Sequence, residues 1–201
     1  MVAVMEIRPV GTSALLIEVD DPLAWFAALD AERAAGRLDV TDIVPGATTV
    51  LLDGVPSVTA VAAALRSWPP PPSAPATADD LDIPVTFDGP DLEAVAALVG
   101  ASTEAVVTAL TSAVFRVAFG GFAPGFAYLS GLPWSVPRLD SPRARVPAGS
   151  VALAAEFAGI YPTASPGGWQ LVGHTDTVLF DIDRTPPALL TPGRTVRFVA
   201  A

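Results

Sequence analysis

The stretch Phe119-Gly-Gly-Phe-Ala-Pro-Gly-Phe-Ala-Tyr-Leu-Ser-Gly-Leu-Pro133 indicates the fold class of the second half of the chain. In it, short apolar runs alternate with Gly and Pro, and the same pattern continues to the end of the sequence. Such punctuation is typical of an all-β barrel or sandwich with many turns. We therefore predict strands at the later apolar runs, which are residues 151–154, 169–172, 178–182 and 195–199.

The first half of the chain alternates between strand-like and helix-like segments. Pro22 suits a first helical turn, Gly36 suits a helix end, and Ser57 suits an N-cap, so we expect helices at 22–35 and 57–66. Strands are expected on either side of them, and their β-α-β-β-α-β order is that of a ferredoxin-like layer. The sequence predicts an α+β protein, with these strands at residues 12–19, 40–44, 48–52 and 82–87.

Two segments separate the halves. Residues 68–80 include four consecutive prolines, which cannot continue a helix and indicate either an exposed connector or a surface loop within one domain. Two short helical patterns follow at 90–99 and 102–113, each with an acidic residue in its first turn. The expected organisation is a small α/β domain at 1–88, a helical bridge at 89–114 and a β-barrel domain at 115–201.

Composition excludes several classes of function. The 201 residues carry a net charge of -10, which argues against nucleic acid because phosphate binding needs a basic stripe. The sequence has no Cys and no Lys, so thiolate metal sites, Cys nucleophiles, Schiff bases and a P-loop lysine are excluded. His174 is the one histidine, and we expect no metal site. Chemistry must therefore rely on carboxylates, hydroxyls, Arg and backbone groups.

Cellular location is predicted from two further absences. The apolar runs are broken well before the roughly 18 residues that a membrane-spanning helix requires. The first nine residues contain Glu6 and Arg8 and lack the pattern of a signal peptide. We expect a cytoplasmic protein that has no contact with a membrane.

Several motifs follow residues 119–133 in order: Pro137-Arg138, Pro142-Arg143, Val146-Pro-Ala-Gly-Ser-Val151, Gly159-Ile-Tyr-Pro162, Ser165-Pro-Gly-Gly-Trp169 and Leu179-Phe-Asp181. Together they resemble the bacterial family called allophanate hydrolase subunit 1, KipI-like protein or the B subunit of ATP-dependent 5-oxoprolinase, because several spaced motifs are specific where one is not. The resemblance implies a cyclophilin-like β-barrel after a small α/β domain. It also implies a relation to the carboxyltransferase part of urea carboxylase.

The resemblance implies a function as well. It is that of a hydrolase subunit that opens 5-oxoproline to glutamate together with subunit 2 (the C subunit of the same system), and with a third, lactam-hydrolase subunit. ATP with Mg would bind at a site shared with the partners, and none would bind to this chain alone. Two alternatives stay open, namely inhibition of a histidine kinase through the acidic N-terminal half, and a role in an allophanate or urea-related hydrolase. A prolyl isomerase rests on fold analogy alone.

The expected site begins in the Gly- and Pro-rich stretch, where the backbone can approach a ligand and aromatic faces can form walls. The alternative is a tight turn with core aromatics. With the resemblance, Tyr128, Arg143 and His174 are the expected catalytic residues. The expected substrate or anion contacts are Phe122, Pro124, Gly125, Phe126, Arg138, Arg145, Gly149, Ser150, Tyr161, Ser165, Gly167, Gly168 and Trp169.

The arginines and the turns suit an anion. Arg138, Arg143 and Arg145 lie within eight residues, and converging guanidinium groups would bind a carboxylate or phosphoryl group. The alternative is that they form ordinary ion pairs. The turns at 147–150 and 165–168 can offer backbone N–H groups and a serine hydroxyl to a developing negative charge.

Two regions depart from the family pattern. His174 stands where relatives usually have Arg, so a group that titrates near neutrality replaces a permanent charge. Phe157 and Ala158 stand where relatives usually have polar residues, which removes two hydrogen-bonding side chains. We expect these departures to change the binding of a polar or anionic substrate.

Overall fold

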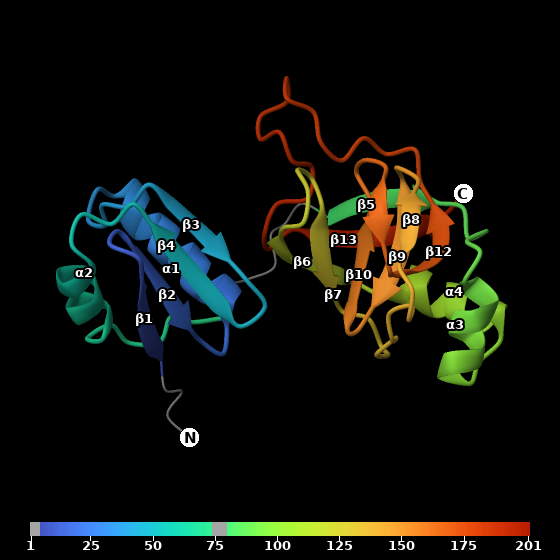
Figure 1. The fold of residues 1–201 in the computed structure, drawn as a ribbon, viewed down its shortest axis with the longest axis horizontal. Coiled ribbons are helices and arrows are strands. Elements are labelled where there is room, and N and C mark those ends of the chain that lie inside the picture. Colours follow the sequence, from blue (N-terminus) through green and yellow to red (C-terminus); the bar gives the residue numbers. More distant parts are fainter. Residues whose placement is uncertain (1–4, 74–79) are drawn as a thin grey trace. The chain divides into compact units, whose positions relative to one another are not determined.

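The computed structural model describes residues 5–73 and 80–201, and the chain forms two compact units, Met1–Pro75 and Ala76–Ala201 (Figure 1). Residues 69–73 of the Pro-rich segment have no regular secondary structure. The remainder of that segment, 74–79, lies outside the described residues. Each unit has its own hydrophobic core, so the two are considered separately.

The first unit is a four-stranded antiparallel sheet with two helices (Figure 1). Its strands lie in the order β1-β2-β4-β3, so the two central strands are β2 and β4. The side chains of Asp21 and Ser57 accept hydrogen bonds from the first turns of the two helices, which confirms the predicted N-cap at Ser57. The elements are β1 (Glu6–Val10), β2 (Ala14–Glu18), α1 (Pro22–Ala34), β3 (Asp42–Pro45), β4 (Thr49–Asp53) and α2 (Val58–Leu65).

Burial in the first unit follows the two-residue period of its central strands. Leu15 and Ile17 of β2, and Val50 and Leu52 of β4, are fully buried, and Leu29 of α1 is buried with them. These side chains lie on the face of the sheet that packs against the helices. The core of the first unit therefore needs no residue from the rest of the chain.

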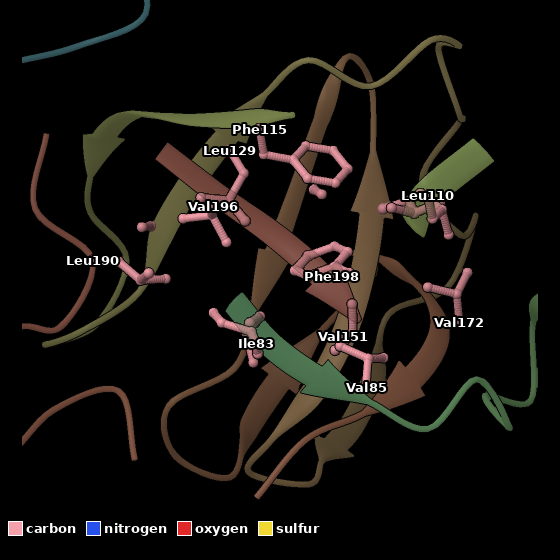
Figure 2. Close-up of a cluster of buried hydrophobic side chains, with 14 of the residues drawn as sticks. Ile83, Val85, Leu110, Phe115, Leu129, Val151, Val172, Leu190, Val196 and Phe198 are labelled. Carbon is pink, nitrogen blue, oxygen red and sulfur yellow. The ribbon is translucent and has the colours of Figure 1, made fainter. Parts of the chain in front are cut away.

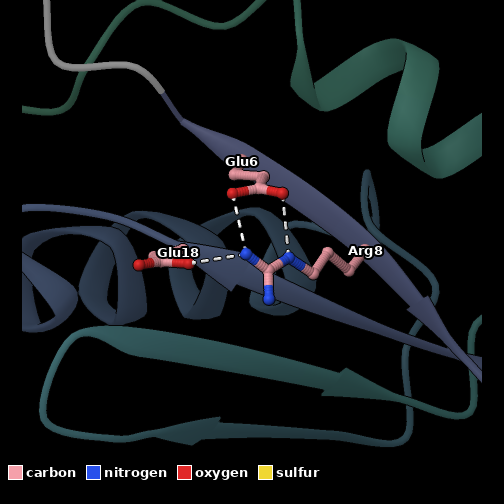
Figure 3. A network of polar contacts seen from close by, with 3 residues as sticks. All are labelled: Glu6, Arg8 and Glu18. Atoms are coloured by element: carbon pink, nitrogen blue, oxygen red, sulfur yellow. Dashed lines mark hydrogen bonds and ion pairs between the residues drawn. The ribbon is translucent and has the colours of Figure 1, made fainter.

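The other side of this sheet carries a charged network (Figure 3). Arg8 on β1 donates two hydrogen bonds of 2.9 Å to Glu6 and one of 3.3 Å to Glu18, which faces Glu6 across the β1–β2 pair. The hydrogen bond from Arg8 lowers the pKa of the Glu6 carboxyl. All three side chains are exposed, so the network contributes little to stability.

The ferredoxin-like arrangement is not confirmed. The sequence patterns did not reveal β1, whose residues lie in the apolar run before the first predicted strand. They also assigned residues 82–87 to the first domain, whereas β5 (Asp80–Val85) pairs in parallel with β13 (Thr195–Ala200) in the second unit. The first unit therefore ends before residue 80, and not at 88.

The second unit contains a seven-stranded sheet in the order β12-β9-β10-β7-β6-β13-β5 (Figure 1). Its two edges meet, because Thr86, which follows β5, exchanges two backbone hydrogen bonds of 2.9 Å with His174 of β12. The sheet is thus nearly closed into a barrel, beside a two-stranded β8–β11 ribbon. The remaining strands are β6 (Phe115–Gly120), β7 (Ala127–Ser130), β8 (Arg143–Val146), β9 (Ser150–Ala154), β10 (Phe157–Ile160), β11 (Ser165–Gly167) and β12 (Gln170–His174).

The barrel is filled by buried aliphatic and aromatic side chains (Figure 2). Phe115 and Phe198 pack with ring centroids 4.8 Å apart, and Val106 and Leu110 of the second helix of this unit join the same core. The expected helical bridge is therefore part of the second unit. Its helices are α3 (Leu92–Val99), which ends at Gly100 with a positive φ, and α4 (Thr103–Ser112).

Three of the four later strand predictions are confirmed, at 151–154, 169–172 and 195–199, by β9, β12 and β13. The fourth is wrong, because 178–182 joins no sheet and has a single isolated bridge between Phe180 and Ala188. No single described helix has the length and apolarity to cross a membrane. Only α3 and α4 taken together match a span in length and composition, and they are bent by 89°.

Candidate functional site

A cavity of about 340 Å³ lies in the second unit between the Gly- and Pro-rich loop and strands β9 to β11. Its walls are mainly aromatic, so we call it the aromatic pocket. Six of its residues carry aromatic rings and one, Arg138, carries a positive charge. The lining residues are Phe122, Phe126, Tyr128, Arg138, Ala154, Ala155, Phe157, Tyr161, Pro166, Gly167 and Trp169.

The rings of the pocket hold one another in place. Phe126 is buried at the centre, with its ring edge-to-face to Tyr128, Tyr161 and Trp169 at centroid distances of 5.3, 5.5 and 5.4 Å. Phe157 packs at 5.6 Å against Tyr128. Edge-to-face contacts of this kind favour one fixed arrangement. The walls are therefore formed before any ligand binds.

Glycines allow the rings to come this close. A Cβ on Gly159 would lie 2.9 Å from the Phe126 ring, and a Cβ on Gly167 would lie 2.2 Å from the Tyr161 hydroxyl. Among the described residues, Phe122 and Ala155 are the two non-glycines with positive φ, at 65° and 49°, and both line this pocket. Such backbone strain is concentrated at functional sites, which supports a role for the pocket.

The polar groups of the pocket are few. The Arg138 guanidinium and the Tyr128 hydroxyl have no hydrogen-bond or ion-pair partner among the described residues. Burial raises the pKa of the Tyr161 phenol, and the backbone of Trp169 partly offsets this effect. The pocket thus offers one cation and one unpaired hydroxyl against apolar walls, which suits a small, flat ligand that carries an anionic group.

A second cavity, of about 480 Å³, contains the other arginines of the predicted site. We call it the arginine pocket. Arg143 donates to Asp91 at 2.6 Å, and the other Asp91 oxygen accepts from the Leu171 backbone N–H at 2.6 Å. It is lined by Asp88, Gly89, Pro90, Arg143, Arg145, Pro147, Ala148, Ser150, Leu171, Gly173 and His174.

The three arginines therefore do not converge, contrary to the sequence prediction. Arg143 and Arg145 are two residues apart on β8 and lie on the same side of that strand, toward the arginine pocket. Arg138 precedes the strand and lines the aromatic pocket. For Arg143, the ion-pair alternative holds, because its guanidinium is bound to the buried Asp91.

His174 also lies apart from the aromatic rings. It is exposed at the end of β12, and its Nδ1 is 2.8 Å from Asp88 Oδ1. The departure at Phe157 does concern the aromatic pocket, where this side chain forms part of the wall. Ala158 is fully buried in the barrel core, so the second departure does not face the pocket.

The predicted residues divide into three groups. Phe122, Phe126, Tyr128, Arg138, Tyr161, Gly167 and Trp169 line the aromatic pocket. Arg143, Arg145, Ser150 and His174 line the arginine pocket. The residues outside both linings are Pro124, Gly125, Gly149, Ser165 and Gly168.

Sequence reasoning missed Asp91 and Asp88 as charge partners and Phe157 as a wall residue. Asp91 was recognised only as an acid at the start of a helical pattern, and nothing in the spacing of the residues links it to Arg143, which is 52 positions away. The described residues contain no group of three or more His, Cys, Asp or Glu side chains that could hold a metal ion.

Comparisons with known proteins place the chain in a family. Residues 5–190 match the family described as carboxyltransferase domain, subdomain C and D. The chain is 39% identical to the B subunit of 5-oxoprolinase from Escherichia coli O157:H7 over 94% of this chain and 93% of that protein.

Solved structures show the same fold. The crystal structure of TTHA0988 has a TM-score of 0.77 and 34% identity, and covers 98% of this chain, which spans 40% of that longer chain. The K. lactis urea amidolyase, with a TM-score of 0.71 over 98% of this chain and 15% of its own, is 18% identical and shares the fold. The chain belongs to the carboxyltransferase domain family, subdomain C and D.

Proposed function

We propose that this chain is the B subunit of a 5-oxoprolinase, a hydrolase that opens the lactam ring of 5-oxoproline to glutamate. The observation that carries the proposal is the aromatic pocket with Arg138 at its lining, in a chain that is 39% identical to a 5-oxoprolinase B subunit. 5-Oxoproline is a small flat ring that bears a carboxylate, and it therefore matches the one cation and the apolar walls of this pocket.

The pocket assigns a role to each of its polar groups. The Arg138 guanidinium would bind the carboxylate by charge-assisted hydrogen bonds, and the Tyr128 hydroxyl would donate to the lactam oxygen. The rings of Phe126, Phe157 and Trp169 would pack on the CH₂ groups of the lactam. Ring opening adds water across the amide bond, with the hydroxyl going to the carbonyl carbon and a proton to the nitrogen. Tyr128 is placed to stabilise negative charge on that oxygen.

ATP is proposed as the energy source, at a site shared with partner subunits. The proposal that this chain supplies little of the Mg–ATP site is supported by the absence of lysine from the sequence and of a cluster of metal ligands from the described residues. In the arginine pocket, Arg143 is already paired with Asp91. We therefore propose that the nucleotide is held largely by subunit 2 and a third, lactam-hydrolase subunit, and that this chain is inactive alone in the cytoplasm.

The test is reconstitution of the enzyme from this chain, subunit 2 and the third subunit, with measurement of ADP release that depends on 5-oxoproline. Arg138→Gln should raise KM for 5-oxoproline by about 10- to 100-fold, because a hydrogen bond to a charged group is worth about 1.5–3 kcal/mol. Tyr128→Phe should lower kcat with a smaller effect on KM, since its hydroxyl acts on the reacting oxygen.

Arg66→Gln is the matched control, because it removes the same charge from the surface of the first unit, where Arg66 has no ion pair among the described residues. Arg66→Gln should leave KM and kcat unchanged. Equal kinetics for Arg138→Gln and Arg66→Gln would refute the substrate site. A verified, folded assembly without 5-oxoproline-dependent turnover would refute the proposed function itself.

A further inference from the structure

The segment 175–182 has the sequence of a strand but is not part of the described sheets. In Figure 1 it belongs to the red connection that runs outside the sheet between β12 and β13. Its alternation is that of a β-strand, since Leu179 is buried while Val178 and Phe180 on either side are exposed. A segment that has a strand pattern and no sheet to join could pair with a strand from another chain.

One edge of this segment is satisfied within the chain. The Leu179 carbonyl accepts from the Leu189 N–H at 2.8 Å, and the Asp181 N–H donates to the Pro187 carbonyl at 3.0 Å. In an extended strand the backbone groups of successive residues point to opposite edges. The N–H groups of Val178 and Phe180 therefore face the other edge, where they have no hydrogen-bond partner among the described residues.

The side chains on this segment form an exposed apolar row. Val178, Phe180 and Ile182 are 62%, 39% and 80% exposed, and the Phe122 ring, at 61%, is exposed as well. An open strand edge with apolar side chains is avoided in proteins that act as free monomers, because it invites pairing with another chain. On the backbone edge beside this row, the Val178 carbonyl accepts from Arg184 at 3.3 Å, while the N–H groups of Val178 and Phe180 have no partner among the described residues. We call the row, with these two N–H groups, the docking edge.

The docking edge is connected to the aromatic pocket. Gly125 of the Gly- and Pro-rich loop packs on the segment so closely that a Cβ there would lie 2.7 Å from the Phe180 Cβ. The same loop carries Phe122, which lines the pocket. A chain bound at the docking edge would therefore touch the loop that forms one wall of the pocket.

We propose that the docking edge binds subunit 2 by strand addition, with a strand of that protein pairing to the backbone of Val178 and Phe180. This inference rests on the proposed function. The occupant is argued from the relatives: TTHA0988 carries more than this fold on one chain, of which the present chain spans 40%, while the E. coli relative is named as one subunit and is covered to 93%. In enzymes made of separate subunits, the additional part of TTHA0988 would correspond to subunit 2.

Hydrogen exchange on the complete complex of this chain with subunit 2 tests the backbone pairing. The amides of Val178 and Phe180 should exchange quickly in the free chain and at least tenfold more slowly after addition of subunit 2. Amides of the exposed α3 helix surface serve as the reference and should not change. This readout distinguishes strand addition from contact through side chains alone.

Point variants test the apolar row. Val178→Asp and Ile182→Asp should each weaken the affinity for subunit 2 at least tenfold, measured by titration calorimetry. Leu98→Asp and Val114→Asp are the matched controls, since these residues are apolar and 53% and 54% exposed elsewhere on the same unit. The controls should change the affinity less than twofold.

Three results would overturn the inference. If the complex forms and hydrolyses 5-oxoproline, but the Val178 and Phe180 amides are not protected and the Asp variants bind normally, the docking edge is wrong and the proposed function stands. If the free chain is a dimer that Val178→Asp dissociates, the occupant is a second copy of this chain. If wild-type chain and subunit 2 form neither a complex nor an active enzyme, both proposals fail.

Discussion

The aromatic pocket and the arginine pocket each contain an arginine from the same stretch of sequence, yet the two arginines are in different chemical states. Arg143 is 2.6 Å from the nearly buried Asp91, whereas Arg138 is exposed and has no such partner among the described residues. A paired guanidinium stabilises the fold, and an unpaired one beside a cavity is available for a ligand. The neighbours of an arginine, and not its position in a motif, therefore determine its role.

The largest effect is expected from breaking the pair in the arginine pocket. Asp91→Ala removes the partner of Arg143 and leaves the Leu171 N–H without its acceptor. The free energy of unfolding should fall by about 3 kcal/mol, because loss of one partner leaves the other charge uncompensated. Urea unfolding followed by circular dichroism measures this change.

Asp82→Ala is the control for this prediction, because Asp82 lies on the exposed side of β5. It should change stability by less than about 0.5 kcal/mol. Equal stabilities of the two variants would mean that the Asp91 pair does not hold the second unit together, and the contrast between the two pockets would disappear.

Tyr161 senses both arginines, because the charges of Arg138 and Arg143 act on its phenol. Burial raises the pKa of Tyr161 above its ordinary value of 10.0, while the two arginines lower it. The folded state thus holds the proton longer than the unfolded chain does. The contribution of the protonated Tyr161 phenol to the free energy of unfolding is therefore fully present below about pH 10, the pKa of the unfolded chain. It should be lost as the pH rises through the pKa of the folded state.

Tyrosinate absorbance of the Tyr128→Phe variant measures this titration directly, since the sequence has only two tyrosines. Adding Arg138→Gln should raise the pKa of Tyr161 further, because one of the lowering charges is removed. A Tyr161 pKa equal to that of the urea-unfolded chain would contradict the buried position of its ring.

The smallest effect is expected at the exposed pair of the arginine pocket. The side chains of His174 and Asp88 are 49% and 59% exposed, so His174→Gln should change the free energy of unfolding by less than about 0.5 kcal/mol. Thermal unfolding at neutral pH checks this value. If His174→Gln lowered the free energy of unfolding as much as Asp91→Ala, the exposed His174–Asp88 pair would stabilise the fold as strongly as the Arg143–Asp91 pair.

Local signals in the sequence predicted much of the fold. Ser57 caps the helix that it precedes, Pro22 lies in the first turn of α1, and the Gly- and Pro-punctuated pattern after Phe115 does form a barrel-like sheet. Pairing between distant strands was not predictable. Residues 80–85 have the same apolar pattern whether they join the first unit or, as the structure has it, β13.

The candidate site likewise has one part that the sequence predicted and another that it did not. The glycines and aromatic residues of one motif come together because they are near in sequence, and Phe122, Phe126 and Tyr128 do line one cavity. The roles of the arginines depended on partners more than 50 positions away, as for Arg143 and Asp91 at 52. Such contacts follow from the register of the barrel, which no short motif specifies.

The parallel pair of β5 and β13 also determines the order of folding. These are the first and last strands of the second unit, and Asp80 faces Thr195 in their register. Contacts of such high sequence separation make folding slow, because a long loop must close before they form. During synthesis, the first unit can fold as soon as it leaves the ribosome, whereas the second must wait for residue 200 before its sheet is complete.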